Sequence, residues 1–210
     1  MASTIQVDNI KDIGGNTMIS SNGSGTFTSN LPASAPNVST ATGTLPIANG
    51  GTGAATFVAA GLANTPGFEA RLTGSQDVSD ATQTLVSVNQ EVYDSDSCYD
   101  TSTYRFTPTT AGKYYCYGTV CCVPSADNVL KEAMTSFRFN GTRTRTSSTT
   151  FNASTFATMT SPFVSEVLTF NGSSDYVELW GRCGVSSGTP RFSSAHATAT
   201  YFGAYRIIGV

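Results

Sequence analysis

The sequence has little charge, and this limits the partners that it can have. Only 12% of its 210 residues are charged, about half the share that is usual in a globular protein. Its formal net charge is -3, so it lacks the basic surface with which proteins hold nucleic acid or anionic lipid. Ser and Thr fill more than a quarter of the positions, and their hydroxyl groups replace ions at the surface. We therefore expect no binding to nucleic acid.

Targeting signals and long apolar runs are also missing. The N-terminal residues Met1–Thr4 have no basic stretch and lead into no apolar segment, so we expect no secretory signal. No apolar run approaches the roughly 18 residues that a membrane-spanning helix needs. We expect no insertion into a membrane.

The residues that commonly hold metals or form disulfides are few. The cysteine count is odd and no Cys-x-x-Cys pair occurs; the five are Cys98, Cys116, Cys121, Cys122 and Cys183. This favours reduced, buried thiols in a chain that folds in a reducing cytoplasm. With a single histidine, the sequence offers no ligand set for zinc. We predict no cofactor and no metal site.

Catalytic patterns are absent as well. His196 stands near Ser193 and Ser194, but no Gly-x-Ser-x-Gly motif accompanies it. Glu166 and Glu178, on two expected neighbouring strands, have nothing else that marks them as a glycosidase pair. We predict that the protein is not an enzyme.

One acidic segment has two interpretations. Asp94, Asp96 and Asp100 fall within seven residues of an expected loop. Carboxylates at alternate positions can bind Ca²⁺, whereas such a run is more often a solvated acidic loop. The sequence does not decide between them.

The first 66 residues differ in composition from the rest. They hold only three charged residues and only two aromatic ones, Phe27 and Phe57. Such a segment cannot bury enough apolar surface to offset its conformational entropy alone. We predict an extended arm over residues 1–30, with short strands at 17–19 and 26–28, and a Pro/Gly/Thr-rich linker over residues 31–66.

From residue 67 the pattern changes to alternating apolar and polar residues separated by turns. Leu85–Tyr93 is one predicted strand, and Asn140-Gly141 is a strong hairpin signal. Phe163–Phe170 and Tyr176–Cys183 flank a second hairpin-like connection. Residues 67–210 are therefore predicted to form one antiparallel β sandwich or barrel.

The spacing of fixed residues within this domain resembles the jelly-roll superfamily of complement C1q and tumour necrosis factor. Five positions fit that pattern: Asp94, Tyr99, Phe106, Gly112 and Tyr114. Three others, Val88, Cys116 and Gly118, replace aromatic residues with smaller ones. The resemblance implies an all-β fold, an antiparallel jelly-roll sandwich head that follows the arm and linker. It also implies a homotrimer, since known members are typically trimers.

The linker provides a second resemblance. Gly43–Gly53 reads Gly-Thr-Leu-Pro-Ile-Ala-Asn-Gly-Gly-Thr-Gly, which is similar to a segment that recurs in phage tail-fibre proteins. This resemblance implies a structural protein of a phage virion, assembled in the cytoplasm of the host bacterium. Residues 1–30 would bind other virion proteins, and the head would bind a host surface glycan or protein, or a neighbouring virion protein. A capsid or neck decoration protein and a free lectin-like module are the alternatives.

The head offers two kinds of candidate contact surface. The Ser- and Thr-rich segment from Arg143 to Thr150, with Arg143 and Arg145, is predicted to be an exposed host-contact loop. Amphipathic aromatic side chains could instead stack on sugar rings or pack a subunit interface; these are Trp180, Tyr115, Tyr117, Tyr201 and Tyr205.

Overall fold

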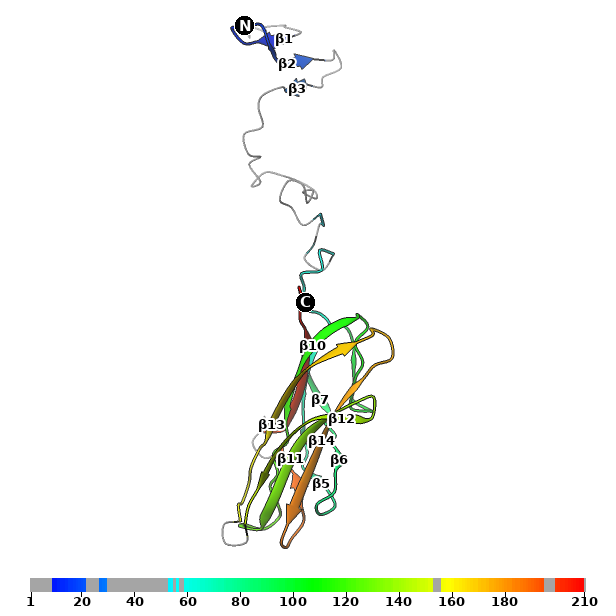
Figure 1. The fold of residues 1–210 in the computed structure, drawn as a ribbon, viewed down its shortest axis with the longest axis vertical. Coiled ribbons are helices and arrows are strands. Elements are labelled where there is room, and N and C mark those ends of the chain that lie inside the picture. Colours follow the sequence, from blue (N-terminus) through cyan, green and yellow to red (C-terminus); the bar gives the residue numbers. More distant parts are fainter. Residues whose placement is uncertain are drawn as a thin grey trace, which may run out of the picture. The chain divides into compact units, whose positions relative to one another are not determined.

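The computed structural model divides the chain into two compact units, Met1–Thr56 and Phe57–Val210 (Figure 1). The residues that the structure describes are 9–21, 27–29, 53–54, 56, 59–152, 156–194 and 199–209. Most of the predicted linker and the Gly43–Gly53 motif therefore lie outside the described residues, apart from Gly53. The division of the chain into residues 1–30, 31–66 and 67–210 stays a prediction.

The first unit contains a small antiparallel sheet. Its strands are β1 (Asn9–Lys11), β2 (Thr17–Ser21) and β3 (Phe27–Ser29), in that order. Asp12 closes the first turn, because its carboxylate accepts hydrogen bonds from the Asn16 backbone nitrogen at 2.8 Å and from Asn16 Nδ2 at 2.9 Å. The two short strands predicted in this segment are confirmed, with β3 displaced by one residue.

The second unit is a sandwich of two antiparallel sheets. The first sheet has the order β13 (Phe163–Phe170), β10 (Gly112–Thr119), β16 (Tyr201–Arg206), β4 (Gly67–Arg71) and β7 (Gln90–Asp94). The second sheet has the order β12 (Thr142–Thr150), β11 (Leu130–Phe139), β14 (Val177–Val185), β9 (Arg105–Phe106) and β8 (Tyr99–Asp100). In addition, β6 (Thr84–Leu85) pairs with β14, and β15 (Arg191–Phe192) pairs with β5 (Gln76–Asp77).

The order of these strands is that of a jelly roll. The chain crosses repeatedly between the sheets, so that the last strand, β16, lies between β4 and β10, and β14 lies between β9 and β11. Two interleaved Greek keys of this kind define the jelly-roll sandwich. The predicted all-β, antiparallel jelly-roll fold is confirmed. Within the described residues, no helix is long and apolar enough to cross a membrane.

Aromatic rings fill the space between the sheets. The Phe68 ring of the first sheet stacks on Tyr99 and Phe106 of the second sheet, with centroid distances of 4.5 and 4.6 Å. The Phe202 ring meets Phe68 edge-on at 4.9 Å. All four side chains are buried, so this cluster joins the two sheets through large apolar surfaces.

The segment Leu85–Tyr93, predicted as one strand, contains a crossover. Its beginning, in β6, pairs with the second sheet, whereas its end, in β7, pairs with the first sheet. Val86 and Val88 are buried in the core, but Val92 is 54% exposed. The predicted alternation placed the core positions correctly. The prediction of a single strand was wrong, because sequence periodicity does not show which sheet a strand joins.

The two predicted hairpins have different outcomes. Asn140 and Gly141, with φ of 50° and 79°, connect β11 to β12, and this hairpin is confirmed. The connection Asn171–Ser174 is not a hairpin, since it joins β13 of the first sheet to β14 of the second. Its turn is nevertheless well defined, because Asn171 Oδ1 accepts the backbone N–H groups of the three residues Ser173–Asp175.

The five cysteines are free and buried, which confirms that they are placed as small apolar side chains. Cys116 and Cys122 project into the sandwich core. Burial raises the pKa of the Cys116 thiol above its usual value. The Cys116 thiol is therefore a poor nucleophile.

The crossover at Gly172 gives a first prediction. Both Gly141 and Gly172 have positive φ, which disfavours any side chain, but a Cβ on Gly172 would also lie 2.4 Å from the Ala111 backbone nitrogen. We expect Gly141→Ala to lower the free energy of unfolding by about 1 kcal/mol, and Gly172→Ala to lower it by clearly more. Urea unfolding of both variants measures this difference, and equal losses would contradict the clash.

Candidate functional surface

The outer face of the first sheet is unusually apolar and aromatic. Alternation along β10 directs Tyr114 and Cys116 into the core, so Tyr115 and Tyr117 point outward. On the neighbouring β16, Tyr201 and Tyr205 point outward in the same way. Adjacent rings are in contact; for example, the centroids of Tyr115 and Tyr205 are 5.6 Å apart.

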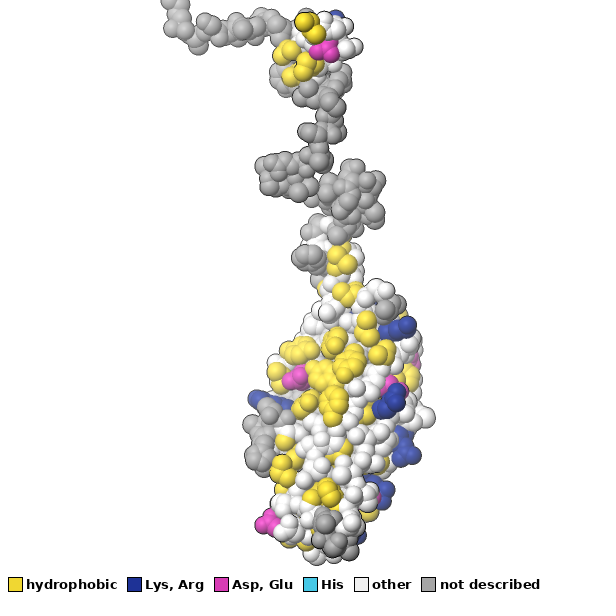
Figure 2. Space-filling model, turned by 60° about the vertical axis from the view of Figure 1, so that its left-hand side comes forward, with side chains coloured by type: hydrophobic (Ala, Val, Ile, Leu, Met, Phe, Trp, Pro, Cys, Tyr) yellow, Lys and Arg dark blue, Asp and Glu magenta, His cyan; other side chains and the backbone are white. Residues whose placement is uncertain are grey.

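Exposed apolar side chains extend this surface to both edges of the sheet. Their exposed fractions range from 39% to 54%; they are Val92, Tyr93, Phe163, Val167 and Tyr205. Figure 2 shows hydrophobic side chains gathered in one patch on the sandwich. We call the outward side chains of β13, β10, β16, β4 and β7 the aromatic face. A contiguous apolar patch of this kind is typical of an interaction surface rather than of a solvated sheet.

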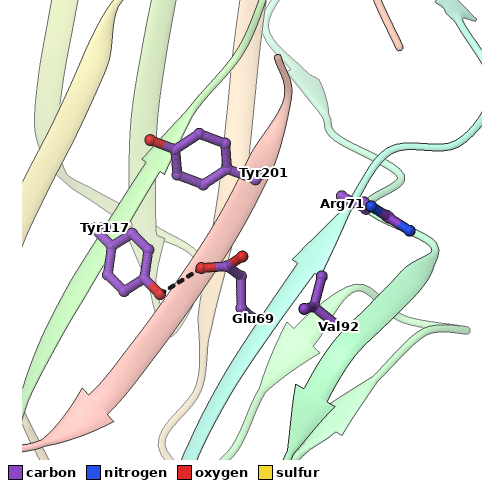
Figure 3. A pocket seen from close by; sticks show the side chains of 5 residues that line it. All are labelled: Glu69, Arg71, Val92, Tyr117 and Tyr201. Carbon is purple, nitrogen blue, oxygen red and sulfur yellow. Dashed lines mark hydrogen bonds between the residues drawn. The ribbon is translucent and has the colours of Figure 1, made fainter. Parts of the chain in front are cut away.

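A row of residues across the strands forms a hollow in the aromatic face. In register, Tyr117 lies opposite Gly203, and Gly203 lies opposite Glu69. Because Gly203 has no side chain, the Tyr117 ring extends over it; a Cβ there would lie 2.5 Å from the Tyr117 hydroxyl oxygen. The hydroxyl thus reaches Glu69 and donates a hydrogen bond of 2.8 Å to Oε2 (Figure 3).

The hollow has a volume of about 410 Å³ and is lined by Glu69, Arg71, Val92, Tyr117 and Tyr201. Its only described acid, Glu69, accepts a hydrogen bond from the Tyr117 hydroxyl, and Arg71 Nε donates to Gln90 Oε1 at 2.8 Å. A surface whose polar groups already have partners is suited to burial against another apolar surface.

The environment of these tyrosines changes their acidity. Burial, followed by the hydrogen bond to Glu69, raises the pKa of the Tyr117 hydroxyl well above its usual value. Burial also raises the pKa of Tyr93 and of Tyr201. These hydroxyls therefore stay neutral at any physiological pH, and that of Tyr117 donates a hydrogen bond rather than acting as a base.

The five residues that fit the jelly-roll pattern all contribute to the structure of the sandwich. Tyr99, Phe106 and Tyr114 are buried between the sheets, and Gly112 has a φ of 146°, which favours glycine. Asp94 fixes the chain between β7 and β8, because its Oδ2 accepts the Tyr99 N–H at 2.8 Å and its Oδ1 accepts the Cys98 N–H at 3.1 Å. All five positions have a role in the fold.

The departures from the family pattern also have a physical reason. Val88 and Cys116 are fully buried within the core, where smaller side chains fit among the aromatic rings. At Gly118, a Cβ would lie 2.9 Å from Leu179 Cδ1 and 3.1 Å from the Tyr201 carbonyl oxygen. No aromatic side chain can occupy that position in this chain.

The carboxylates of the acidic segment accept hydrogen bonds from the segment's own backbone. Asp94 accepts three backbone N–H groups, and Asp100 accepts the Ser102 backbone N–H at 2.8 Å and two hydroxyl groups. The Ser102 hydrogen bonds are the main reason that the pKa of Asp100 falls to about 2. Within the described part of the chain, no group of three or more His, Cys, Asp or Glu side chains could hold a metal ion.

The segment predicted as a host-contact loop is a strand. Residues Thr142–Thr150 form β12, which pairs with β11 over most of its length. The alternation of this segment was hidden because its residues are nearly all polar, so hydrophobic periodicity gave no signal. Arg143 and Arg145 are both exposed, and a role in contacting the host stays a prediction.

The remaining catalytic candidates are not brought together. Glu166 lies on β13 of the first sheet and Glu178 on β14 of the second. The prediction that they occupy neighbouring strands was therefore wrong. Glu178 is buried and held by Arg105 Nε at 2.8 Å and by Trp180 Nε1 at 2.9 Å. His196 lies outside the described residues.

Comparisons with known proteins concern the sandwich. No family model and no curated protein sequence matches the chain. Among solved structures, it is similar to Eiger TNF from S. frugiperda, with a TM-score of 0.47 and 12% identity over 69% of this chain and 92% of that chain. It is also similar to murine APRIL at pH 5.0, with a TM-score of 0.46 and 12% identity over 67% and 98% of the two chains. The fold assignment itself rests on the strand order described above.

The buried tyrosines predict a characteristic alkaline titration. Burial raises the pKa of Tyr114 to about 12, and those of Tyr99 and Tyr117 are raised as well. Since a phenol is charged when deprotonated, the stability due to these shifts is complete below pH ~10 and is lost as the pH rises toward the folded-state values. Tyrosinate absorbance should therefore show part of the nine tyrosines ionising only with unfolding.

Tyr117→Phe provides the control for this titration. The variant should reduce the late absorbance change by the contribution of one tyrosine and leave the early change as it was. Ionisation of all tyrosines near pH 10 in a protein that remains folded by circular dichroism would refute the burial of these hydroxyls.

Proposed function

We propose that this chain is a non-enzymatic homotrimeric binding protein, and that it serves as a fibre or spike of a phage virion. In this proposal the sandwich trimerises through the aromatic face. Residues 1–30 anchor the protein to the particle, and the head contacts the host surface or a neighbouring virion protein. The protein would be assembled in the host cytoplasm, where its cysteines remain reduced.

The aromatic face is the observation on which the proposal rests. A second copy of the chain is the occupant that fits it best, because the face offers two different apolar parts. Phe163 and Val167 lie on the edge strand β13, whereas Val92 and Tyr93 lie on β7 at the opposite edge. If the β13 edge of one copy packs on the β7 side of the next, the contact is heterologous, and a threefold rotation between copies closes such contacts into a three-membered ring.

The N-terminal segment supports the attachment role. The sheet β1–β3 has short strands of three, five and three residues, and a sheet of this size needs a packed hydrophobic face for independent stability. Ile10 is 47% exposed, and Ile13 is fully exposed at the turn after β1. A segment of this kind gains its stability from a partner, and the similarity of Gly43–Gly53 to tail-fibre proteins favours a virion protein as that partner.

A charge on the aromatic face should prevent assembly. Val167 is 50% exposed in one copy, so Val167→Lys should fold as the wild type does but place a charge in the interface. We expect the wild type to have three times the mass of the 21.9 kDa chain by light scattering, and the variant to be a monomer. Ser148→Lys, on β12 of the second sheet, is the control and should stay trimeric. A monomeric wild type would refute the trimer.

Removal of the N-terminal segment tests the virion role. We expect a chain that lacks residues 1–30 to fold and trimerise but to be missing from purified particles by mass spectrometry. Incorporation of the shortened chain would contradict the anchoring role. Particles without the head that assemble but fail to adsorb would identify a receptor-binding protein, whereas normal adsorption with weaker particles would identify a decoration protein.

A further inference from the structure

The outer face of the second sheet has a different character from the aromatic face, because it is rich in arginine. Arg105, Arg138, Arg143 and Arg182 all belong to the strands of this sheet. Two of these charges are neutralised locally. Arg105 Nε lies 2.8 Å from Glu178 Oε1, and Arg182 Nη2 lies 2.7 Å from Glu132 Oε1.

The other two arginines form no ion pair within the described residues, although Glu178 of β14 lies opposite Arg138 in register. Arg138 on β11 and Arg143 on β12 are directly opposite in register. Like charges at directly opposed positions of a sheet destabilise it. Anionic groups bound to these arginines would remove the cost of this repulsion.

Arg138 is held in place for such a contact. Its guanidinium carbon lies 3.6 Å from the centre of the Trp180 ring, and its Nη2 donates to Gln83 Oε1 at 2.8 Å. Trp180 is fixed in turn by its hydrogen bond to Glu178. The guanidinium group of Arg138 is thus oriented before any ligand arrives, so little side-chain entropy is lost on binding.

A bulge separates Arg143 from Arg145. Arg138 pairs with Arg143 but Ser136 pairs with Thr146, so β12 has one extra residue at this point. Thr146 therefore shares the outer face with Arg143, whereas Arg145 turns to the other face, where its Nη2 lies 3.8 Å from Glu166 Oε1. The sequence suggested Arg143 and Arg145 as a pair, but the structure pairs Arg143 with Arg138.

We propose that Arg138 and Arg143 bind the anionic groups of an acidic polysaccharide. The surface beside them is a strand face with outward hydroxyl groups at Thr146, Ser148 and Thr150, which suits a hydroxylated, extended chain. Two arginines in a chain with a net charge of -3 match a polymer with widely spaced charges. Nucleic acid, with one charge per ~1.7 Å of duplex, requires a more basic surface.

The test measures binding to hyaluronan, which has a carboxylate in every disaccharide, with neutral dextran and single-stranded oligothymidine as comparison ligands. We expect the full chain to bind hyaluronan and not dextran. Arg143→Gln should weaken this binding about tenfold or more, because one charge-assisted contact is lost. Arg145→Gln removes the same charge from the same strand on the other face, and should leave the affinity unchanged.

Thermal unfolding adds a readout that distinguishes the site from general charge attraction. Without ligand, Arg143→Gln should melt at a higher temperature than the wild type, because the like-charge pair is relieved, whereas Arg145→Gln should not. Equal weakening of binding by both variants, tighter binding of oligothymidine, or no hyaluronan binding would overturn the proposal. The same two variants are then compared in a Val167→Lys background, which separates this site from the trimer. Loss of the trimer should lower the avidity for hyaluronan, but the effect of Arg143→Gln should remain.

Discussion

The stacking of Phe68 on Tyr99 and Phe106 is the contact on which the rest of the sandwich depends. It joins β4 of the first sheet to β8 and β9 of the second through rings less than 5 Å apart. The Tyr99 hydroxyl, in the interior, donates to the Val88 carbonyl oxygen at 2.7 Å. Once these rings are packed, the strands can turn only one set of side chains inward, and the character of both outer faces follows.

The two outer faces differ because the alternation of each strand places different side chains on them. On the first sheet, tyrosines and branched apolar side chains point outward, and the Tyr117 hydroxyl donates to Glu69. On the second sheet, the outward residues include four arginines, three of which are held by Trp180, Glu178 and Glu132. A sandwich with one apolar and one charged face can assemble through the first and leave the second free for a ligand.

Glycine has a specific part in this surface. Gly203 allows Tyr117 to cross β16 and reach Glu69, and Gly118 gives space to Leu179 beneath the same sheet. Neither residue shows this role in the sequence, since a glycine within a strand predicts only a bulge or a close approach of some kind. The partner in that close approach is known only once the strands are placed side by side.

The sequence by itself determined the all-β fold and the Asn140-Gly141 hairpin, because these depend on alternation and on local backbone preference. It also supplied the jelly-roll expectation through five spaced residues. Only the tertiary structure showed that Leu85–Tyr93 crosses between sheets, that β13 and β14 belong to different layers, and that Arg143 faces Arg138 instead of acting with Arg145. These features depend on which strands pair and in what register, and contacts between residues far apart in the chain decide that pairing.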